Sequence, residues 1–205
     1  MTAILLCLSL TTWAQGTWER PQQAAPAQTA TNTGEYEYAK YLGNVVPVVN
    51  GEVIWEKTFT NQKDAGQNYT TMLNFLTAMT TEEGQLKEST VSLVNKEEHK
   101  IVCRFQEWMV FKNSLLALDR TRLIYQLIAE CHDGKVKVTI FRINYWYEEE
   151  RDGGSRYKAE EWITDEWALN KKKTRLAKIS GKFRRKTVDR MEEIFQNISN
   201  CLGAQ

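Results

Sequence analysis

Proline is scarce in this sequence. Only 3 of its 205 residues are proline, and none follows Pro47. Proline removes a backbone hydrogen-bond donor and interrupts helices and central strands. The long stretch after Pro47 therefore predicts tightly connected secondary structure without internal breaks.

Long apolar runs and an excess of one charge are also missing. Beyond the first residues, no stretch is apolar over the about 18 residues that a membrane-spanning helix needs. We therefore expect a mature protein that is soluble or peripheral to a membrane, with no transmembrane segment. The formal net charge is only +1, which argues against nucleic acid as the partner.

Signatures of catalysis and of cofactor binding are absent from the sequence. It contains no G-x-S-x-G elbow and no phosphate-binding glycine loop. The acidic run from Glu148 to Asp152 lacks the spacing of a calcium-binding loop. His99 and His132 flank predicted turns without a metal-type partner at a recognisable spacing. We predict no cofactor and no metal, and an enzyme whose site is scattered in the sequence stays an alternative.

The N-terminus has the pattern of an export signal. An apolar run extends from Ile4 to Leu10, and Thr12-Trp13-Ala14 places small residues at the two positions that determine cleavage. We predict a signal peptide over residues 1–14 and an exported protein, periplasmic or extracellular. No Lys or Arg precedes the apolar run, so either the true start lies upstream or the leader is atypical. A first core strand is the alternative interpretation.

A polar linker and one domain follow the leader. Residues 15–35 are rich in Gln, Ala, Thr and Pro, and such a composition cannot bury enough surface to offset the entropy of ordering. Residues 36–203 then provide one domain, long enough for a stable core without disulfides. Asn50-Gly51 between apolar runs predicts an N-terminal edge hairpin with arms at 45–49 and 52–57.

Apolar spacing predicts a helix, four strands and a second helix. Helical spacing indicates a helix from about Asn61 to Met79. Around the Asp133-Gly134 turn, the apolar residues pair as Cys131 with Val136, Ala129 with Val138 and Leu127 with Ile140. The apolar positions change phase near Phe141-Arg142, which predicts a bulge or a change of sheet face. A final stripe ends before Gly203 and contains Phe183, Val188, Met191, Ile194, Phe195, Ile198 and Leu202.

These elements predict an α+β fold. It would be a two-layer sandwich in which a curved antiparallel sheet carries both helices on one face. The segments KYLGNVVPVVNGEVIWEKTF and EEWITDEWALNKKKTRLAKISGKFRRKTVDRMEEIF resemble the opening and the ending of a family of secreted bacterial proteins. That family is a domain of unknown function with a fold like that of the TATA-binding protein. The resemblance covers about Tyr41 to Leu202 and implies a β-α-β-β-β-β-α order, but no catalytic residues and no DNA binding.

A basic segment and an aromatic cluster are the candidate sites. The candidate anion patch comprises Lys171, Lys172, Lys173, Arg175, Arg184 and Arg185, in a stretch that no acidic residue interrupts. The alternative is that the acidic stretch Glu148 to Glu166 neutralises it. The candidate partner surface comprises Tyr145, Trp146 and Tyr147, placed on the sheet face without helices. The alternative is that these aromatics simply cover that face.

Two cysteines could form a disulfide in an oxidising compartment. Cys103 and Cys131 lie on consecutive predicted strands and on the same face, so they would bridge if the register placed them opposite each other. Two buried free thiols are the alternative.

For function, we expect an interaction or ligand-binding module whose partner is an unknown envelope protein or a small ligand. The oligomeric state stays open.

Overall fold

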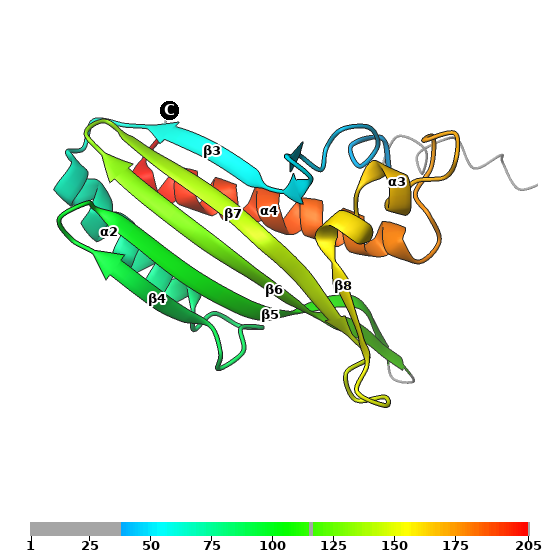
Figure 1. Ribbon diagram of the computed structural model, residues 1–205. Helices are drawn as coiled ribbons and strands as arrows, with labels where there is room; N and C mark the ends of the chain where they lie inside the picture. The colour runs from blue at the N-terminus through cyan, green and yellow to red at the C-terminus, as the bar shows by residue number, and fades with distance from the viewer. Residues whose placement is uncertain (1–37, 115–116, 205) are drawn as a thin grey trace, which may run out of the picture. The chain divides into compact units, whose positions relative to one another are not determined.

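The computed structural model describes residues 38–114 and 117–204, and Figure 1 shows the order of the elements. The predicted signal peptide and the whole predicted linker lie outside these residues. The strands are β1 (Val48–Val49), β2 (Glu52–Val53), β3 (Trp55–Thr60), β4 (Thr90–Asn95), β5 (Lys100–Ser114), β6 (Ala117–His132), β7 (Lys135–Tyr147) and β8 (Ser155–Lys158). The helices are α2 (Ala65–Met79), a 3-10 turn (Ala159–Glu161), α3 (Asp165–Ala168) and α4 (Ser180–Leu202).

One antiparallel sheet carries the fold. Its strand order is β3-β7-β6-β5-β4, and β8 pairs with β7 beyond this path. The predicted pairs around Asp133-Gly134 are confirmed: Cys131 lies opposite Val136, Ala129 opposite Val138 and Leu127 opposite Ile140. The tight turn fixes this register, and a register fixed at a turn propagates along both strands.

The N-terminal hairpin is shorter than predicted. Asn50 and Gly51 have φ of 52° and 83°, as a type I′ turn requires, and they connect β1 to β2 in a separate two-stranded sheet. The predicted second arm divides after Val53. Its continuation, β3, leaves the hairpin and pairs with β7, where Trp55 lies opposite Ile140. The burial of Trp55 and Phe59 in the core stabilises this pairing.

A bulge in the middle of the sheet is confirmed at the predicted place. The register between β6 and β7 shifts between Ile124 and Gln126, opposite Arg142, whose φ is 53°. A residue added to one strand reverses the alternation of side chains beyond it. Ile143 and Tyr145 consequently face the same side as Ile140, and all three are buried.

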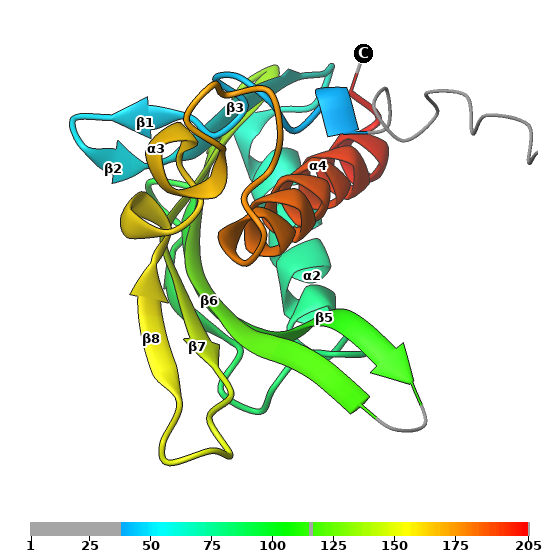
Figure 2. The same cartoon turned by 90° about the vertical axis from the view of Figure 1, so that its right-hand side faces the viewer.

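Both long helices pack on one face of the sheet, which confirms the predicted two-layer α+β sandwich (Figures 1 and 2). Figure 2 shows the long strands bending around the helices. The first helix begins at Ala65, later than predicted, because Asp64 and Gln67 form a capping box. Helix α4 ends at Gly203, which adopts a left-handed conformation with φ of 63°. None of the helices in the described part of the chain is long and apolar enough to cross a membrane.

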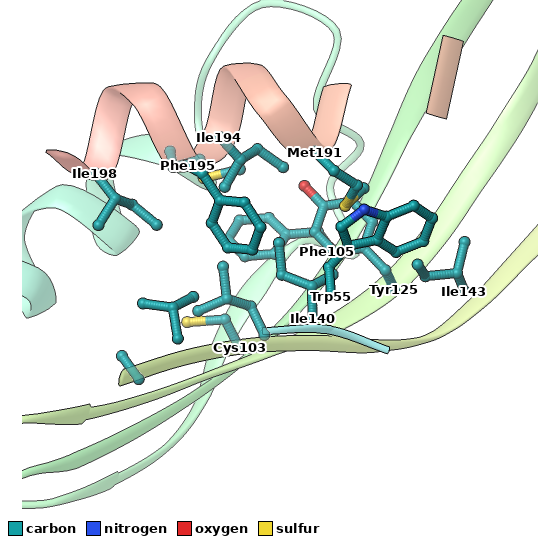
Figure 3. Packing of buried hydrophobic residues seen from close by; sticks show 14 of the residues in the cluster. Trp55, Cys103, Phe105, Tyr125, Ile140, Ile143, Met191, Ile194, Phe195 and Ile198 are labelled. Carbon is teal, nitrogen blue, oxygen red and sulfur yellow. The ribbon is translucent and has the colours of Figure 1, made fainter. Parts of the chain in front are cut away.

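The core lies between α4 and the middle strands, as Figure 3 shows. Phe105 and Tyr125 stack with ring centroids 5.2 Å apart. Met191 and Phe195 of α4 lie on the helix side of this cluster, and Ile140 of β7 lies on the sheet side. Since these side chains are buried, the sheet and α4 hold each other in place through burial of apolar surface.

The possible disulfide between Cys103 and Cys131 is not formed, and the alternative of two buried free thiols holds. Cys103 lies opposite Leu127, four residues from Cys131 along β6, which is about 13 Å at roughly 3.3 Å per residue. A disulfide requires Cα atoms within about 7 Å. Both cysteines are free and buried, and burial raises the pKa of each thiol to about 12, so each is an unreactive apolar side chain at neutral pH.

Candidate functional site

The structure removes Arg184 from the predicted anion patch. Arg184 is fully buried at the start of α4. Its Nε donates to the carbonyl of Tyr41 at 2.7 Å, its Nη1 to the carbonyl of Ile163 at 2.9 Å, and its Nη2 to the carbonyl of Gly43 and to Asp165 Oδ1 at 2.7 Å. A guanidinium with its donors occupied in this way cannot bind a further anion.

Arg184 instead connects three segments that are distant in the sequence. The turn containing Tyr41 and Gly43, the segment from Ile163 to Asp165, and α4 all meet at this one side chain. The Asp165 carboxylate balances its charge. A buried charge needs such a partner, because leaving it unpaired costs several kcal/mol.

The rest of the predicted patch is accessible. Lys171, Lys172, Lys173 and Arg175 are exposed on the loop between α3 and α4, and Arg185 is half-buried on α4. This loop is ordered by its own contacts: the Asn170 side chain accepts hydrogen bonds from the backbone of Thr174 and Arg175, and Ala177 N donates to Ala168 O at 2.8 Å.

A groove of about 460 Å³ lies between this loop and α4, and we call it the basic groove. Its lining is Tyr38, Leu42, Thr174, Arg175, Leu176, Ala177, Lys178, Gly181, Lys182 and Arg185. Gly181 lets the loop approach the helix closely, because a Cβ at this position would lie 2.7 Å from Leu176 Cβ. The Arg185 guanidinium lies 5.8 Å from the centre of the Tyr38 ring, within reach of a cation–π contact.

The acidic stretch neutralises only a small part of the patch. Lys173 lies 3.8 Å from Asp165. The acids Glu148, Glu149 and Glu150 pair with arginines of the hairpin and the sheet instead, at Arg151, Arg122 and Arg120. Among the residues that the structure describes, no carboxylate forms a salt bridge with Arg175, Lys178 or Arg185.

Lys182 has a different role from the other cations of the basic groove. Its Nζ donates to Asp119 Oδ2 at 2.6 Å and to the Tyr147 hydroxyl at 3.1 Å. Burial lowers the pKa of Lys182, but the hydrogen bonds to Asp119 and Tyr147 outweigh this effect, so the pKa is raised. Lys182 is therefore charged at neutral pH and already has a counter-ion.

The predicted position of Tyr145 and Tyr147 on the open sheet face is wrong. Tyr145 is buried on the helical side, with its hydroxyl 2.7 Å from Thr187 Oγ1 of α4. Tyr147 packs against Phe183 with ring centroids 5.3 Å apart. The bulge at Arg142 explains both positions, because it returns the apolar residues to the helical side after the change of phase.

Trp146 does lie on the open face, in a row that sequence reasoning missed. Trp108 of β5, Arg122 of β6, Trp146 of β7 and Arg156 of β8 are direct cross-strand neighbours. The Arg122 guanidinium lies 5.6 Å from the Trp108 ring and 5.0 Å from the Trp146 ring, and Arg156 lies 4.0 Å from Trp146. We call this row the Trp–Arg ladder. It could be found only once the register of four strands was known.

The Trp–Arg ladder covers the sheet with the protein's own side chains. Arg122 also donates to Gln106 and Glu149, and its side chain is only 16% exposed. The aromatic rings and the stems of the arginines shield the backbone at this end of the sheet. This arrangement favours the packing interpretation of the open face over a free partner surface.

A second hollow, of about 500 Å³, contains carboxylates that are already bound. It is lined by Glu107, Asp189 and Glu193, among others. Arg190 binds Glu107 through two hydrogen bonds of 2.9 and 2.8 Å, and Lys40 and Tyr41 donate to Asp189. The oxygen atoms of Glu107 and Asp189 are therefore already engaged within the protein. No group of metal-binding side chains was found in residues 38–114 and 117–204.

Known proteins similar to this chain share its fold. A family model described as a domain of unknown function (DUF4468) with TBP-like fold matches residues 56–146. The crystal structure of a DUF4468 family protein from Bacteroides ovatus is 36% identical, with a TM-score of 0.75, and the match covers 82% of this chain and 96% of that chain.

A more distant structure has the same architecture. The TBP-like protein from Parabacteroides distasonis is 18% identical, with a TM-score of 0.63, and the match covers 78% of this chain and 99% of that one. At this identity the likeness concerns the fold alone. No curated protein matches the chain.

Serine substitutions at Tyr145 and Trp146 should lower the free energy of unfolding by different amounts. Tyr145→Ser should lower the free energy of unfolding by about 3–5 kcal/mol, because it leaves a cavity and an unpaired Thr187 hydroxyl. Trp146→Ser should cost about half of that or less, since its ring stays in contact with water on one side. Urea unfolding measures both values, with the exposed Trp167→Ser as control. Equal losses for Tyr145→Ser and Trp146→Ser would contradict the assignment of the two faces.

Proposed function

This chain belongs to the DUF4468 family, whose members have a TBP-like fold, and we propose that it is an exported, non-enzymatic module that binds an anionic ligand in the cell envelope. The proposed site is the basic groove. The ligand is either a small molecule or the anionic part of an envelope protein, and nucleic acid is not the proposed partner.

One observation carries this proposal. Arg175, Lys178 and Arg185 surround an apolar floor without a salt bridge to any carboxylate that the structure describes. Cations on a protein surface are commonly paired or fully solvated, whereas three cations around an apolar hollow are arranged to receive an anion. The arginines add directional recognition, because a guanidinium can donate two parallel hydrogen bonds to a phosphate or a carboxylate.

The apolar residues of the groove determine which kind of molecule should carry the anionic group. Leu42, Leu176 and Ala177 line the same groove as the cations and give it apolar surface, which we call its floor. A fully hydrated inorganic anion would gain nothing from this surface, whereas an anion with a short hydrocarbon body would bury it favourably. We therefore propose an amphiphilic anion, with its charged group at Arg175 and Arg185 and its apolar part against the floor.

Octyl phosphate is a suitable probe for this ligand chemistry. Isothermal titration of the full chain, below the concentration at which octyl phosphate forms micelles, should show tighter binding of octyl phosphate than of inorganic phosphate or octyl glucoside. The variant Arg175→Ser/Arg185→Ser should bind about tenfold more weakly or worse, because each lost charge-assisted hydrogen bond is worth about 1.5–3 kcal/mol.

A matched control removes the same charge outside the basic groove. Lys171→Ser/Lys172→Ser also removes two cations from the same loop, but neither residue lines the groove. This control should retain binding within about threefold, since exposed charges at this distance are screened by salt. Equal losses in the two variants, or equal affinity for octyl phosphate and octyl glucoside, would overturn the proposed site.

Export is the second part of the proposal, and it rests on the sequence. The apolar run from Ile4 to Leu10 and the small residues around Trp13 match a cleaved signal peptide. We expect N-terminal sequencing of the protein from its native host to give a chain that starts near Gln15, recovered from the envelope or the medium. Recovery of Met1 in the cytosolic fraction would contradict export.

A further inference from the structure

Two large apolar side chains are exposed beside the basic groove. Trp167 of α3 is 51% exposed, and Ile179, the residue before α4, is 59% exposed. Single exposed apolar residues are common on protein surfaces. An exposed tryptophan beside an exposed isoleucine and a group of cations is a more specific combination, because the indole ring favours the boundary between water and lipid.

Backbone neighbours place Trp167 and Ile179 near the groove. Ser180 Oγ donates to the carbonyl of Trp167 at 2.6 Å, so α3 and the start of α4 are held together. Ile179 directly follows Lys178, a residue of the groove lining. Figure 2 shows α3, the loop after it and the first turns of α4 gathered at one end of the domain.

Positive charge is concentrated at the same end. Its cations are Lys171, Lys172, Lys173, Arg175, Lys178 and Arg185. The acids of the adjoining 3-10 turn and α3 are fewer: Glu160, Glu161, Asp165 and Glu166. Glu160 accepts from Val53 N, and Asp165 pairs with Arg184 and Lys173. The whole chain has a net charge of only +1, so this end has a local surplus of positive charge.

We propose that this end is a membrane-docking surface that binds a bilayer with anionic lipids. Trp167 and Ile179 enter the interfacial region of the bilayer, and the lysines of the loop lie against the lipid headgroups. The basic groove receives the phosphate of one lipid. This inference rests on the proposed function, since it identifies the amphiphilic anion as a lipid in a membrane.

Charge complementarity and the apolar pair together favour a bilayer over other occupants. A soluble anion would use the groove alone and would leave Trp167 and Ile179 without a role. An anionic bilayer surface engages the dispersed lysines as well as the groove, because its charge extends over the whole contact area. A bilayer also accounts for the exposure of the tryptophan, which lies at the depth of the headgroups in such complexes.

Vesicle sedimentation tests the docking surface directly. The chain from Gln15 onward, which is the mature form under the proposed export and lacks the apolar leader, is mixed with vesicles of phosphatidylglycerol and phosphatidylcholine, or of phosphatidylcholine alone, over a series of salt concentrations. We expect binding to the anionic vesicles that weakens as salt rises. Trp167→Ser/Ile179→Ser should reduce this binding about tenfold, and Lys171→Ser/Lys172→Ser should reduce it by about fivefold for each cation removed. Circular dichroism confirms that each variant is folded.

The octyl phosphate titration separates this inference from the proposed function. Trp167→Ser/Ile179→Ser should keep its affinity for octyl phosphate, since neither residue lines the groove, whereas Arg175→Ser/Arg185→Ser should lose both activities. Octyl phosphate binding without vesicle binding would overturn membrane docking and leave the proposed function intact. Vesicle binding that is insensitive to Trp167→Ser/Ile179→Ser, or equal on both kinds of vesicle, would also overturn it. If the unsubstituted chain bound neither octyl phosphate nor anionic vesicles, both proposals would be overturned.

Discussion

The buried guanidinium of Arg184 is the interaction on which the binding end of this domain depends. It is fully buried, and it donates hydrogen bonds to the carbonyls of Tyr41, Gly43 and Ile163 and to the carboxylate of Asp165. Two segments that are distant in the sequence, the turn at residues 41–43 and the segment at residues 163–165, thereby meet at α4. The basic groove lies beside this junction, because Leu42 lies in the same turn, Tyr38 lies just before it, and the loop to α4 follows α3. Its walls come from segments that this single side chain connects.

The sheet supports this end by a different means. The bulge at Arg142 directs Tyr145 and Tyr147 towards α4, where they contact Thr187 and Phe183. The same strand exposes Trp146 on the other face, where the Trp–Arg ladder covers the sheet. One irregularity in β7 therefore divides the aromatic residues between the core and the open face. The loop before α4 lies outside the sheet and the two long helices. It carries Arg175 and Lys178 beside the basic groove, and neither forms a salt bridge within the described part of the chain.

The sequence allowed the register of β6 with β7 and both long helices to be predicted, because these depend on local patterns. The Asp133-Gly134 turn defines which residues of β6 and β7 face each other, and helical spacing defines the stripe of α4. Cys103 was misplaced because the connection from β5 to β6 has no tight turn, so its register depends on distant packing. The burial of Arg184 could have been predicted from its helical spacing, but its charge led to its assignment to the surface. Arg184 precedes Val188 and Met191 by four and seven residues, which places it on the buried stripe. The Trp–Arg ladder and the basic groove could not be predicted, because each is formed by segments that are distant in the sequence and meet only in the folded protein.

Urea unfolding of Arg184→Met tests most directly whether this side chain holds the binding end together. Methionine matches the apolar length of the side chain but leaves the three carbonyls and Asp165 without their donor. The free energy of unfolding should fall by about 3–5 kcal/mol, as expected when one partner of a buried ion pair is removed. Lys186→Met, which removes a partly exposed charge from the same helix, should change it by about 0.5 kcal/mol or less. Losses of similar size in the two variants would contradict the central place given to Arg184.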